Sequence, residues 1–205
     1  MTWKISEQTS MKMKLNSHYW ENRYLTNDAA WDAGSITTPI KDYIDQLEGK
    51  NLSILIPGCG NGYEFEYLME KGFPNSYVLD YAESPLRNLK ARNPGCTDDR
   101  FIQSDFFVHE GTYDLILEQT FFCALDPGLR AAYARKMHTL LAPGGKLAGL
   151  LFQFPLTEKG PPFGGSEAEY RSLFSEYFEI KTLEPAYNSI KPRQGNELFF
   201  IFTKK

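Results

Sequence analysis

A glycine-rich segment between a strand pattern and a helix pattern carries the strongest chemical signal in this 205-residue sequence. Gly58, Gly60 and Gly62 follow the apolar run 52–56. Glycines at such a turn let the backbone approach a ligand closely and adopt positive φ angles. Tyr63 stands where a dinucleotide-binding G-x-G-x-x-G sequence has its third glycine, and the turn lacks the Gly-Lys-Ser/Thr of a P-loop. The segment therefore predicts a nucleoside-binding turn of another kind.

Two aspartates follow the next two strand patterns. Asp80 ends the pattern 76–79, and a carboxylate at the carboxyl end of the second strand can accept hydrogen bonds from two ribose hydroxyls. Asp105 follows the pattern 101–103, where it can meet an adenine amino group, and Phe106 beside it can pack on the ring. An aspartate considered alone is more often a turn or capping residue. Their order after the glycine turn favours an adenosine pocket.

An adenosine cofactor without a pyrophosphate fits this turn, and S-adenosylmethionine is the obvious candidate. Its sulfonium is a cation, which favours aromatic walls. Trp20, Tyr24 and Trp31 in the N-terminal segment are available to form one. The alternative for these three residues is a hydrophobic seam that packs the segment on the sheet. The histidines and cysteines form no set with metal-ligand spacing, so we expect no metal cofactor.

Three basic residues are candidates for a methyl-acceptor site. Arg130 lies on the helix after the sequence FFCALDP, and Lys191 and Arg193 lie in the loop 186–196. A cationic side chain at the site would draw in an anionic acceptor. The alternative is a solvated surface charge, since exposed charges seldom contribute much.

Two further features belong to the same predicted acceptor site. Phe121 and Phe122 follow the strand pattern 113–118 at its carboxyl end, where open α/β sheets bind ligands, although core packing explains them about as well. The glycine- and proline-rich segment 155–165 is long enough to cover the site, and we predict that it determines specificity rather than only connecting elements.

The elements that must position these residues alternate between short apolar runs and helical segments, which is typical of βαβ units on a parallel sheet. We expect strands over 52–56, 76–79, 101–103, 113–118, 146–154, 178–183 and 197–202. The run 146–154 is too continuously apolar for a surface strand and is expected in the centre. The last two strands follow each other without a helix, which predicts an antiparallel pair at the sheet edge.

Helix signals lie between these strands and ahead of them. We expect helices over 17–27, 39–47, 62–71, 84–92, 128–141 and 166–176. Ser84-Pro85 and Asp126-Pro127 have the form of an N-cap followed by proline, and Ser166 with Glu169 has the form of a capping box. The prediction is a doubly wound α/β fold with a mostly parallel seven-stranded sheet and an N-terminal helical extension. Within this single domain, 1–50 would form a cofactor lid and helices, and 51–205 a Rossmann-like core.

Composition excludes several other classes of protein. The chain is 42% hydrophobic and 23% charged, so it can bury a core. Its net charge of −4 weighs against a nucleic-acid partner, which needs a basic face. No apolar run approaches the length of about 18 residues that a membrane span needs, and the N-terminus lacks the apolar stretch of a signal peptide. Cys59, Cys96 and Cys123 have unrelated spacings, which favours reduced thiols in a cytoplasmic protein.

The motifs, taken in order, resemble those of a known family. They are YWENRY, WDAGSITTP, ILIPGCGNG, Asp80, SDFF, YDLILEQTFFCALDPGLR, LLAPGGKL and KGPPFG. The sequence resembles the class I S-adenosylmethionine-dependent methyltransferases of the thiopurine and thiol/halide methyltransferase family, over about residues 17–204. The glycine turn is common to all class I methyltransferases, whereas the WDAG…TP, FFCA and GPPF segments are more specific. The resemblance implies a seven-stranded sheet whose last strand is antiparallel.

The resemblance also implies roles for individual residues. It implies aromatic residues that enclose the cofactor, further residues that contact its methionine, ribose and adenine parts, and basic residues near the acceptor. The predicted cofactor set is Trp20, Tyr24, Trp31, Gly58, Gly60, Asp80, Tyr81, Asp105, Phe106 and Gln119. The acceptor set is Arg130 and Arg193, to which the strand pattern before it adds Phe122. Three positions depart from the family pattern. Gln119 stands where thiol/halide members tend to have tyrosine, Tyr24 where many have tryptophan, and Glu118 where aspartate is usual.

The function expected from residues and resemblance is methyl transfer from S-adenosylmethionine to a small soft nucleophile, with S-adenosylhomocysteine as the product. The acceptor would be a thiol, thiocyanate, a halide or a thiopurine sulfur, and a chalcogen oxyanion such as tellurite is a further option. A thiolate or halide is already nucleophilic, so no strong general base is needed. One alternative is a catalytically silent S-adenosylmethionine-binding sensor or partner domain. An NAD-dependent reductase is disfavoured by Tyr63, which stands in place of the third glycine of the dinucleotide-binding pattern.

Overall fold

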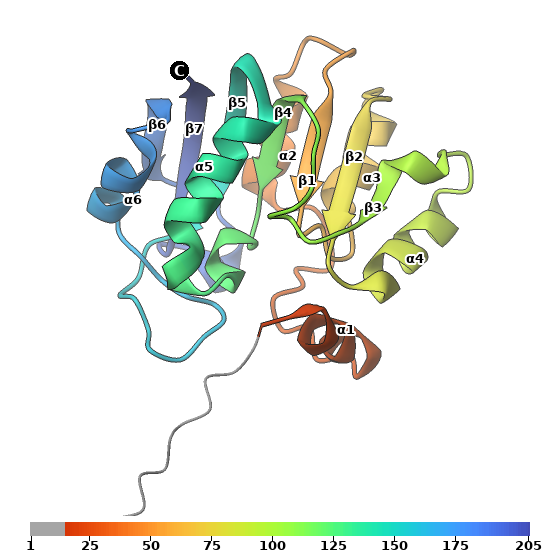
Figure 1. The fold of residues 1–205 in the computed structure, drawn as a ribbon, viewed down its shortest axis with the longest axis horizontal. Coiled ribbons are helices and arrows are strands. Elements are labelled where there is room, and N and C mark those ends of the chain that lie inside the picture. The colour runs from red at the N-terminus through yellow and green to blue at the C-terminus, as the bar shows by residue number, and fades with distance from the viewer. Residues whose placement is uncertain (1–14) are drawn as a thin grey trace, which may run out of the picture.

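The computed structural model describes residues 15–205, and the first fourteen residues of the predicted 1–50 segment lie outside it. The described chain forms a seven-stranded sheet in the order β3-β2-β1-β4-β5-β7-β6 (Figure 1). The strands are β1 Ile54–Pro57, β2 Ser76–Asp80, β3 Phe101–Gln103, β4 Tyr113–Glu118, β5 Leu141–Phe152, β6 Phe178–Pro185 and β7 Glu197–Lys204. Strands β1 to β5 pair in parallel, and β7 pairs antiparallel with both β5 and β6. The predicted central position of the fifth strand and the antiparallel pair at the edge are confirmed.

Helices cover both faces of this sheet. They are α1 Ser17–Leu25, α2 Thr38–Asp45, α3 Tyr63–Glu70, α4 Glu83–Arg92, α5 Arg130–Leu140 and α6 Glu167–Phe174. In Figure 1, α5 and α6 lie in front of the sheet, and α2 and α3 lie behind it. Alternate side chains of β1 pack on opposite faces of the sheet. Leu55 packs with the α5–α6 cluster, whereas Ile54 and Ile56 pack with the α2–α3 cluster. Burial on both faces explains why β1 is continuously apolar, and the helices on the two faces confirm the doubly wound fold.

Two of the predicted helix starts have the expected caps. The Ser166 side chain accepts a hydrogen bond from the backbone N–H of Glu169 at 3.3 Å, ahead of α6. The Asp126 carboxylate accepts one from the N–H of Gly128 at 2.9 Å and begins a short 3-10 turn that leads into α5. Side-chain oxygens at these positions satisfy N–H groups that have no partner within the helix.

The predicted cap of α4 is wrong. The N-cap of this helix is Ala82, and Ser84 lies within the first turn. Its backbone N–H donates a hydrogen bond of 2.9 Å to the carboxylate of Glu21, and its hydroxyl contacts the same carboxylate. A tertiary partner on α1 therefore satisfies the helix terminus in place of a local cap.

Helix α1 lies apart from both helical layers, at the carboxyl ends of the parallel strands (Figure 1). It contains no buried residue, so packing on the core does not define its position. The chain continues from α1 through residues 26–37 to α2, and this connection passes the glycine turn. Among residues 15–205, no helix is both long and apolar enough to cross a lipid bilayer.

Candidate active site

A cavity of about 390 Å³ lies where the carboxyl ends of β1, β2 and β4 meet α1 and the connection after it. Open α/β sheets bind ligands at this edge. All of the predicted cofactor residues line it: Trp20, Tyr24, Trp31, Gly58, Gly60, Asp80, Tyr81, Asp105, Phe106 and Gln119. Arg193 also lines it, as do Pro161 and Pro162 of the loop 155–165. Sequence segments far apart along the chain thus converge on one cavity.

The glycine turn forms the floor of the cavity with bare backbone. Gly58 has φ +61° and Gly60 has φ +50°, both in the left-handed region. A Cβ atom on Gly58 would lie 2.4 Å from the Phe121 ring, and one on Gly60 would lie 3.0 Å from the Tyr24 hydroxyl. Glycine is therefore required here by backbone conformation and by space. A side chain at either position would displace Phe121 or Tyr24, which both line the cavity.

The Asp80 carboxylate is buried beside this turn and is held by backbone donors. Its Oδ2 accepts a hydrogen bond from the N–H of Gly60 at 3.0 Å, and its Oδ1 accepts one from the N–H of Ala82 at 2.9 Å. Burial raises the pKa of this carboxyl above its usual value, although the N–H donors oppose that shift. Each oxygen keeps a further acceptor position. A vicinal pair of hydroxyl groups, such as those of a ribose, matches this arrangement of acceptors.

Asp105 is also fixed by hydrogen bonds. Its Oδ1 accepts the N–H of Phe107 at 2.8 Å, and its Oδ2 accepts the hydroxyl of Tyr81 at 3.1 Å. Phe106 is buried and packs edge-on against Phe121, with ring centroids 5.1 Å apart. Phe106 thus forms part of the core and of the cavity wall at the same time. An acidic oxygen beside an apolar ring suits a flat heterocycle with amino groups.

The aromatic residues of the N-terminal segment form a cluster that lines the cavity. The Trp20 and Trp31 rings lie 5.5 Å apart and nearly perpendicular, and the Tyr24 ring lies 5.7 Å from Trp31 in the same relative orientation. The Arg23 guanidinium lies 4.9 Å from the Trp31 ring centroid. The three rings pack against one another and line the cavity, and none of them belongs to the core clusters on the two faces of the sheet. Their π faces provide surfaces that attract cations.

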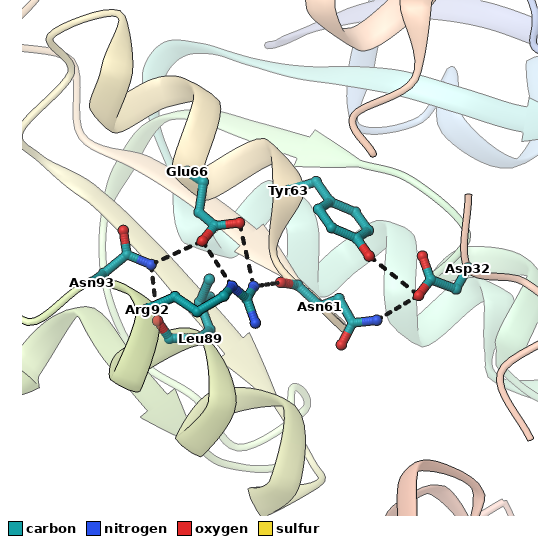
Figure 2. Close-up of polar contacts among 7 residues, drawn as sticks. All are labelled: Asp32, Asn61, Tyr63, Glu66, Leu89, Arg92 and Asn93. Carbon is teal, nitrogen blue, oxygen red and sulfur yellow. Dashed lines mark hydrogen bonds and ion pairs between the residues drawn. The ribbon is translucent and has the colours of Figure 1, made fainter. Parts of the chain in front are cut away.

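A hydrogen-bonded chain ties this segment to the glycine turn (Figure 2). Asp32 Oδ2 accepts hydrogen bonds from the Asn61 side-chain amide at 2.6 Å and from the Tyr63 hydroxyl at 3.3 Å. The Asn61 carbonyl accepts one from Arg92 at 2.5 Å, and Arg92 forms an ion pair of 2.9 Å with Glu66. The position of residue 32 next to Trp31 therefore depends on the turn that forms the cavity floor. The sequence alone gave no sign of this contact.

The turn after β4 is organised by a buried carboxylate. Glu118 Oε1 accepts the backbone N–H groups of Phe121 at 2.8 Å and Phe122 at 2.9 Å, and its Oε2 accepts the Tyr133 hydroxyl. Burial raises the pKa of Glu118 to about 7. Within this turn Thr120 has φ +58°, which is unfavourable for a β-branched residue. Such strain persists only where neighbouring contacts enforce it, here at the cavity wall.

The two predicted acceptor arginines differ in position. The Arg193 side chain lines the cavity, and its Nη2 donates a hydrogen bond of 2.7 Å to the Trp31 carbonyl. Arg130 is buried outside the cavity, where its Nη1 forms an ion pair of 2.5 Å with Glu169 and its Nη2 donates to the Gly164 carbonyl at 2.7 Å. Lys191 is exposed and does not line the cavity. Of the three basic candidates, the structure brings only Arg193 to the cavity.

Phe122 also lies outside the cavity lining. It is 1% exposed and packs among Tyr133, Tyr170 and Phe174 in the core, whereas its neighbour Phe121 faces the cavity. The 3-10 turn Phe122–Ala124 rotates the two consecutive side chains in different directions. The identities of the two residues are the same, so the sequence did not distinguish them.

Some residues that line the cavity were not predicted from the sequence. Glu64 is 8% exposed and lines the cavity from the first turn of α3, and burial raises its pKa to about 7. Its position directly after the glycine turn could have indicated that it lines the site. Asp32 and Thr120 line the cavity through tertiary contacts and a strained backbone, which no local pattern indicates. Among residues 15–205, no three His, Cys, Asp or Glu side chains gather as metal ligands would.

Comparison with known proteins decides the family. The family model described as thiopurine S-methyltransferase matches residues 15–202. The chain belongs to the thiopurine S-methyltransferase family. A protein of Arabidopsis thaliana named probable thiol methyltransferase 2 is 32% identical over 186 residues, which cover 87% of this chain and 81% of that protein. Thiocyanate methyltransferase 1 of Brassica oleracea is 28% identical over the same share of both chains.

More distant members of the thiopurine S-methyltransferase family and solved structures agree with this placement. The thiopurine S-methyltransferase of Vibrio cholerae is 25% identical and covers 76% of this chain and 79% of its own. The crystal structure of Burkholderia thailandensis 1,6-didemethyltoxoflavin-N1-methyltransferase, with bound S-adenosylhomocysteine, superposes with a TM-score of 0.77 at 18% identity, covering 92% of this chain and 87% of that one. At that identity the likeness establishes the fold, which is that of a class I methyltransferase.

Proposed function

We propose that this chain transfers the methyl group of S-adenosylmethionine to a small soft nucleophile, either a thiol, thiocyanate, a halide or a thiopurine sulfur. The observation that carries the proposal is the buried Asp80 carboxylate, hydrogen-bonded to Gly60 in the turn that floors an aromatic-walled cavity. The relatives named thiol, thiocyanate and thiopurine S-methyltransferases support a sulfur or other soft acceptor.

The residues present fit this cofactor. Asp80 would accept the ribose hydroxyls, Asp105 and Phe106 would meet the adenine, and the bare backbone of Gly58 and Gly60 would adjoin the methionine part. When bound, S-adenosylmethionine supplies a methyl carbon on a sulfonium, and the products are the methylated acceptor, S-adenosylhomocysteine carrying the electron pair of the broken bond and, from a thiol, one proton released to water.

The chain's own residues contribute binding and orientation rather than acid–base chemistry. A soft nucleophile must be held about 3–3.5 Å from the carbon that it attacks and in line with the leaving sulfur. The aromatic cluster of Trp20, Tyr24 and Trp31 would keep water from this line and face a cationic group with its π surfaces. Arg193, which lines the same cavity and donates a hydrogen bond to the Trp31 carbonyl, would border the acceptor.

Two segments complete the proposed site. Residues 1–50 would act as a lid over the cofactor, which is supported by the hydrogen bonds from Asn61 and Tyr63 to Asp32. The loop 155–165 would help to determine which acceptor enters, since Pro161 and Pro162 line the cavity. We place the activity in the cytoplasm, because the three cysteines are free thiols.

A methyl-transfer screen tests the proposal. The purified protein is incubated with S-adenosylmethionine and, in turn, hydrosulfide, thiocyanate, iodide, a benzyl thiol and a thiopurine, and S-adenosylhomocysteine is quantified. We expect turnover with at least one acceptor, and loss of turnover at limiting cofactor concentration in Asp80→Ala. Tight binding of S-adenosylmethionine without turnover of any acceptor would contradict the enzymatic proposal and favour the silent sensor.

A further inference from the structure

A buried ion pair lies beside the part of the cavity that is lined by Arg193, Phe152, Pro161 and Pro162. We call this part the acceptor end. Arg193 is 9% exposed and Glu197 is 3% exposed, and Arg193 Nη1 lies 3.5 Å from Glu197 Oε1. Nη1 of the arginine and Oε2 of the glutamate have no hydrogen-bond partner. Removing two charges from water this completely is costly unless each compensates the other. The pair therefore has to be considered as one electrostatic unit.

Glu197 lies directly behind the cavity wall. It borders a second space of about 10 Å³, together with Thr120, Cys123 and Phe152. These three residues also line the large cavity, so they form the partition between the two spaces. The carboxylate is thus separated from the acceptor end by a single layer of side chains. At that separation its charge acts on whatever binds there.

Among residues 15–205, each lysine or arginine side chain that lines the cavity is paired with a carboxylate. Among the described residues, Arg23 and Arg193 are the lysine or arginine side chains that line the cavity. Arg23 forms an ion pair of 2.8 Å with Asp28, and Arg193 is matched by Glu197. The other residues of this wall are mainly apolar, namely Phe121, Leu125, Leu129, Phe152, Pro161 and Pro162, with Thr120 and Cys123 beside them. Glu64, which also lines the cavity and interacts electrostatically with Arg193, adds no positive charge. An anion entering here would lose its hydration without gaining an uncompensated positive charge.

We infer that Glu197 determines acceptor specificity: by neutralising Arg193 it makes the site select uncharged thiols with apolar substituents over anions such as iodide and thiocyanate. The inference rests on the proposed methyl-transfer function and narrows its acceptor class. Glu197 is a positioning residue, since it acts through Arg193 and through the wall rather than by touching the acceptor.

A double-variant cycle that removes the two charges singly and together tests the inference. The ratio of kcat/KM for iodide or thiocyanate to kcat/KM for benzyl thiol is measured at pH 7, where this thiol is protonated. Glu197→Gln keeps the size of the side chain and removes its charge, so we expect the ratio to rise about tenfold or more, because a buried charge several ångströms away acts through a low effective dielectric. Arg193→Gln should lower the ratio. The double variant should return it close to the wild-type value.

The matched control is a second ion pair, buried Arg130 with the partly exposed Glu169, which does not line the cavity. Glu169→Gln should leave the ratio unchanged. A purely structural role for Glu197 would lower both rates together, so an unchanged ratio in Glu197→Gln overturns the inference. If that variant does not fold, an unchanged ratio in Arg193→Gln overturns it in the same way. Failure of the proposed function is distinguishable, because the wild-type protein would then methylate neither class of acceptor.

Discussion

Replacing Asp80 with asparagine perturbs the contact on which the cofactor assignment depends. In the protein both carboxylate oxygens accept a backbone N–H, from Gly60 at 3.0 Å and Ala82 at 2.9 Å. An asparagine presents one amide NH₂ to one of these donors and removes the charge that strengthens hydrogen bonds from ligand hydroxyls. Loss of charge-assisted hydrogen bonds is worth about 1–3 kcal/mol, so S-adenosylhomocysteine should bind about 5- to 150-fold more weakly.

Isothermal titration calorimetry with S-adenosylhomocysteine measures this change, with circular dichroism to verify folding. The matched control is Asp114→Asn. Asp114 Oδ2 also accepts a hydrogen bond from a backbone N–H, that of Ser53 at 2.9 Å, but it lies at the amino-terminal end of β4, away from the cavity. We expect wild-type affinity in that control. A folded Asp80→Asn variant that binds with wild-type affinity would refute the ribose assignment.

Three further predictions concern the walls of the site. Gly58→Ala should lower the free energy of unfolding in urea by about 2 kcal/mol or more, because its Cβ would lie 2.4 Å from the Phe121 ring at φ +61°; a change below about 0.5 kcal/mol would contradict the packing argument. The pKa of Glu118 rises from 4.5 to about 7 in the folded protein, so the folded state binds the proton more tightly than the unfolded state. The free energy of unfolding of the wild-type protein should therefore fall as pH rises from 4.5 to 7, by up to about 3 kcal/mol from this group. Glu118→Gln should remove that part of the slope in urea titrations across this pH range, and an unaltered slope would count against it. Asp32→Asn should weaken the contact with Asn61, raise the Kd for S-adenosylhomocysteine several-fold and increase quenching of tryptophan fluorescence by acrylamide, whereas unchanged quenching would argue against a lid held at this point.

The order and type of the elements were predictable from the sequence, because each depends on a local pattern. Apolar runs followed by glycine or aspartate marked the parallel strands, and Ser166 with Glu169 marked the start of α6. Boundaries that depend on tertiary contacts were less accurate. Strand β5 begins at Leu141 rather than 146, since Leu141 pairs with Tyr113 before a register shift. Ser84 has the form of a cap, but Glu21 from a distant helix contacts it instead.

The same distinction applies to the site. Residues at the ends of strands, such as Asp80 and Asp105, were predictable because the topology of a doubly wound sheet brings strand ends together. Arg130 and Arg193 are both basic and both near loops in the sequence, and only tertiary packing places one outside the cavity and the other on its wall. Glu197 is separated from the cavity by one layer of side chains. This short distance cannot be inferred from the spacing of residues along the sequence.

A crystal structure of the protein with S-adenosylhomocysteine is the most direct test of the central claim. The account predicts density for the nucleoside in the cavity, with both ribose hydroxyls hydrogen-bonded to Asp80 and the adenine beside Asp105. Density for the ligand elsewhere on the molecule, or a ribose turned away from this carboxylate, would contradict it.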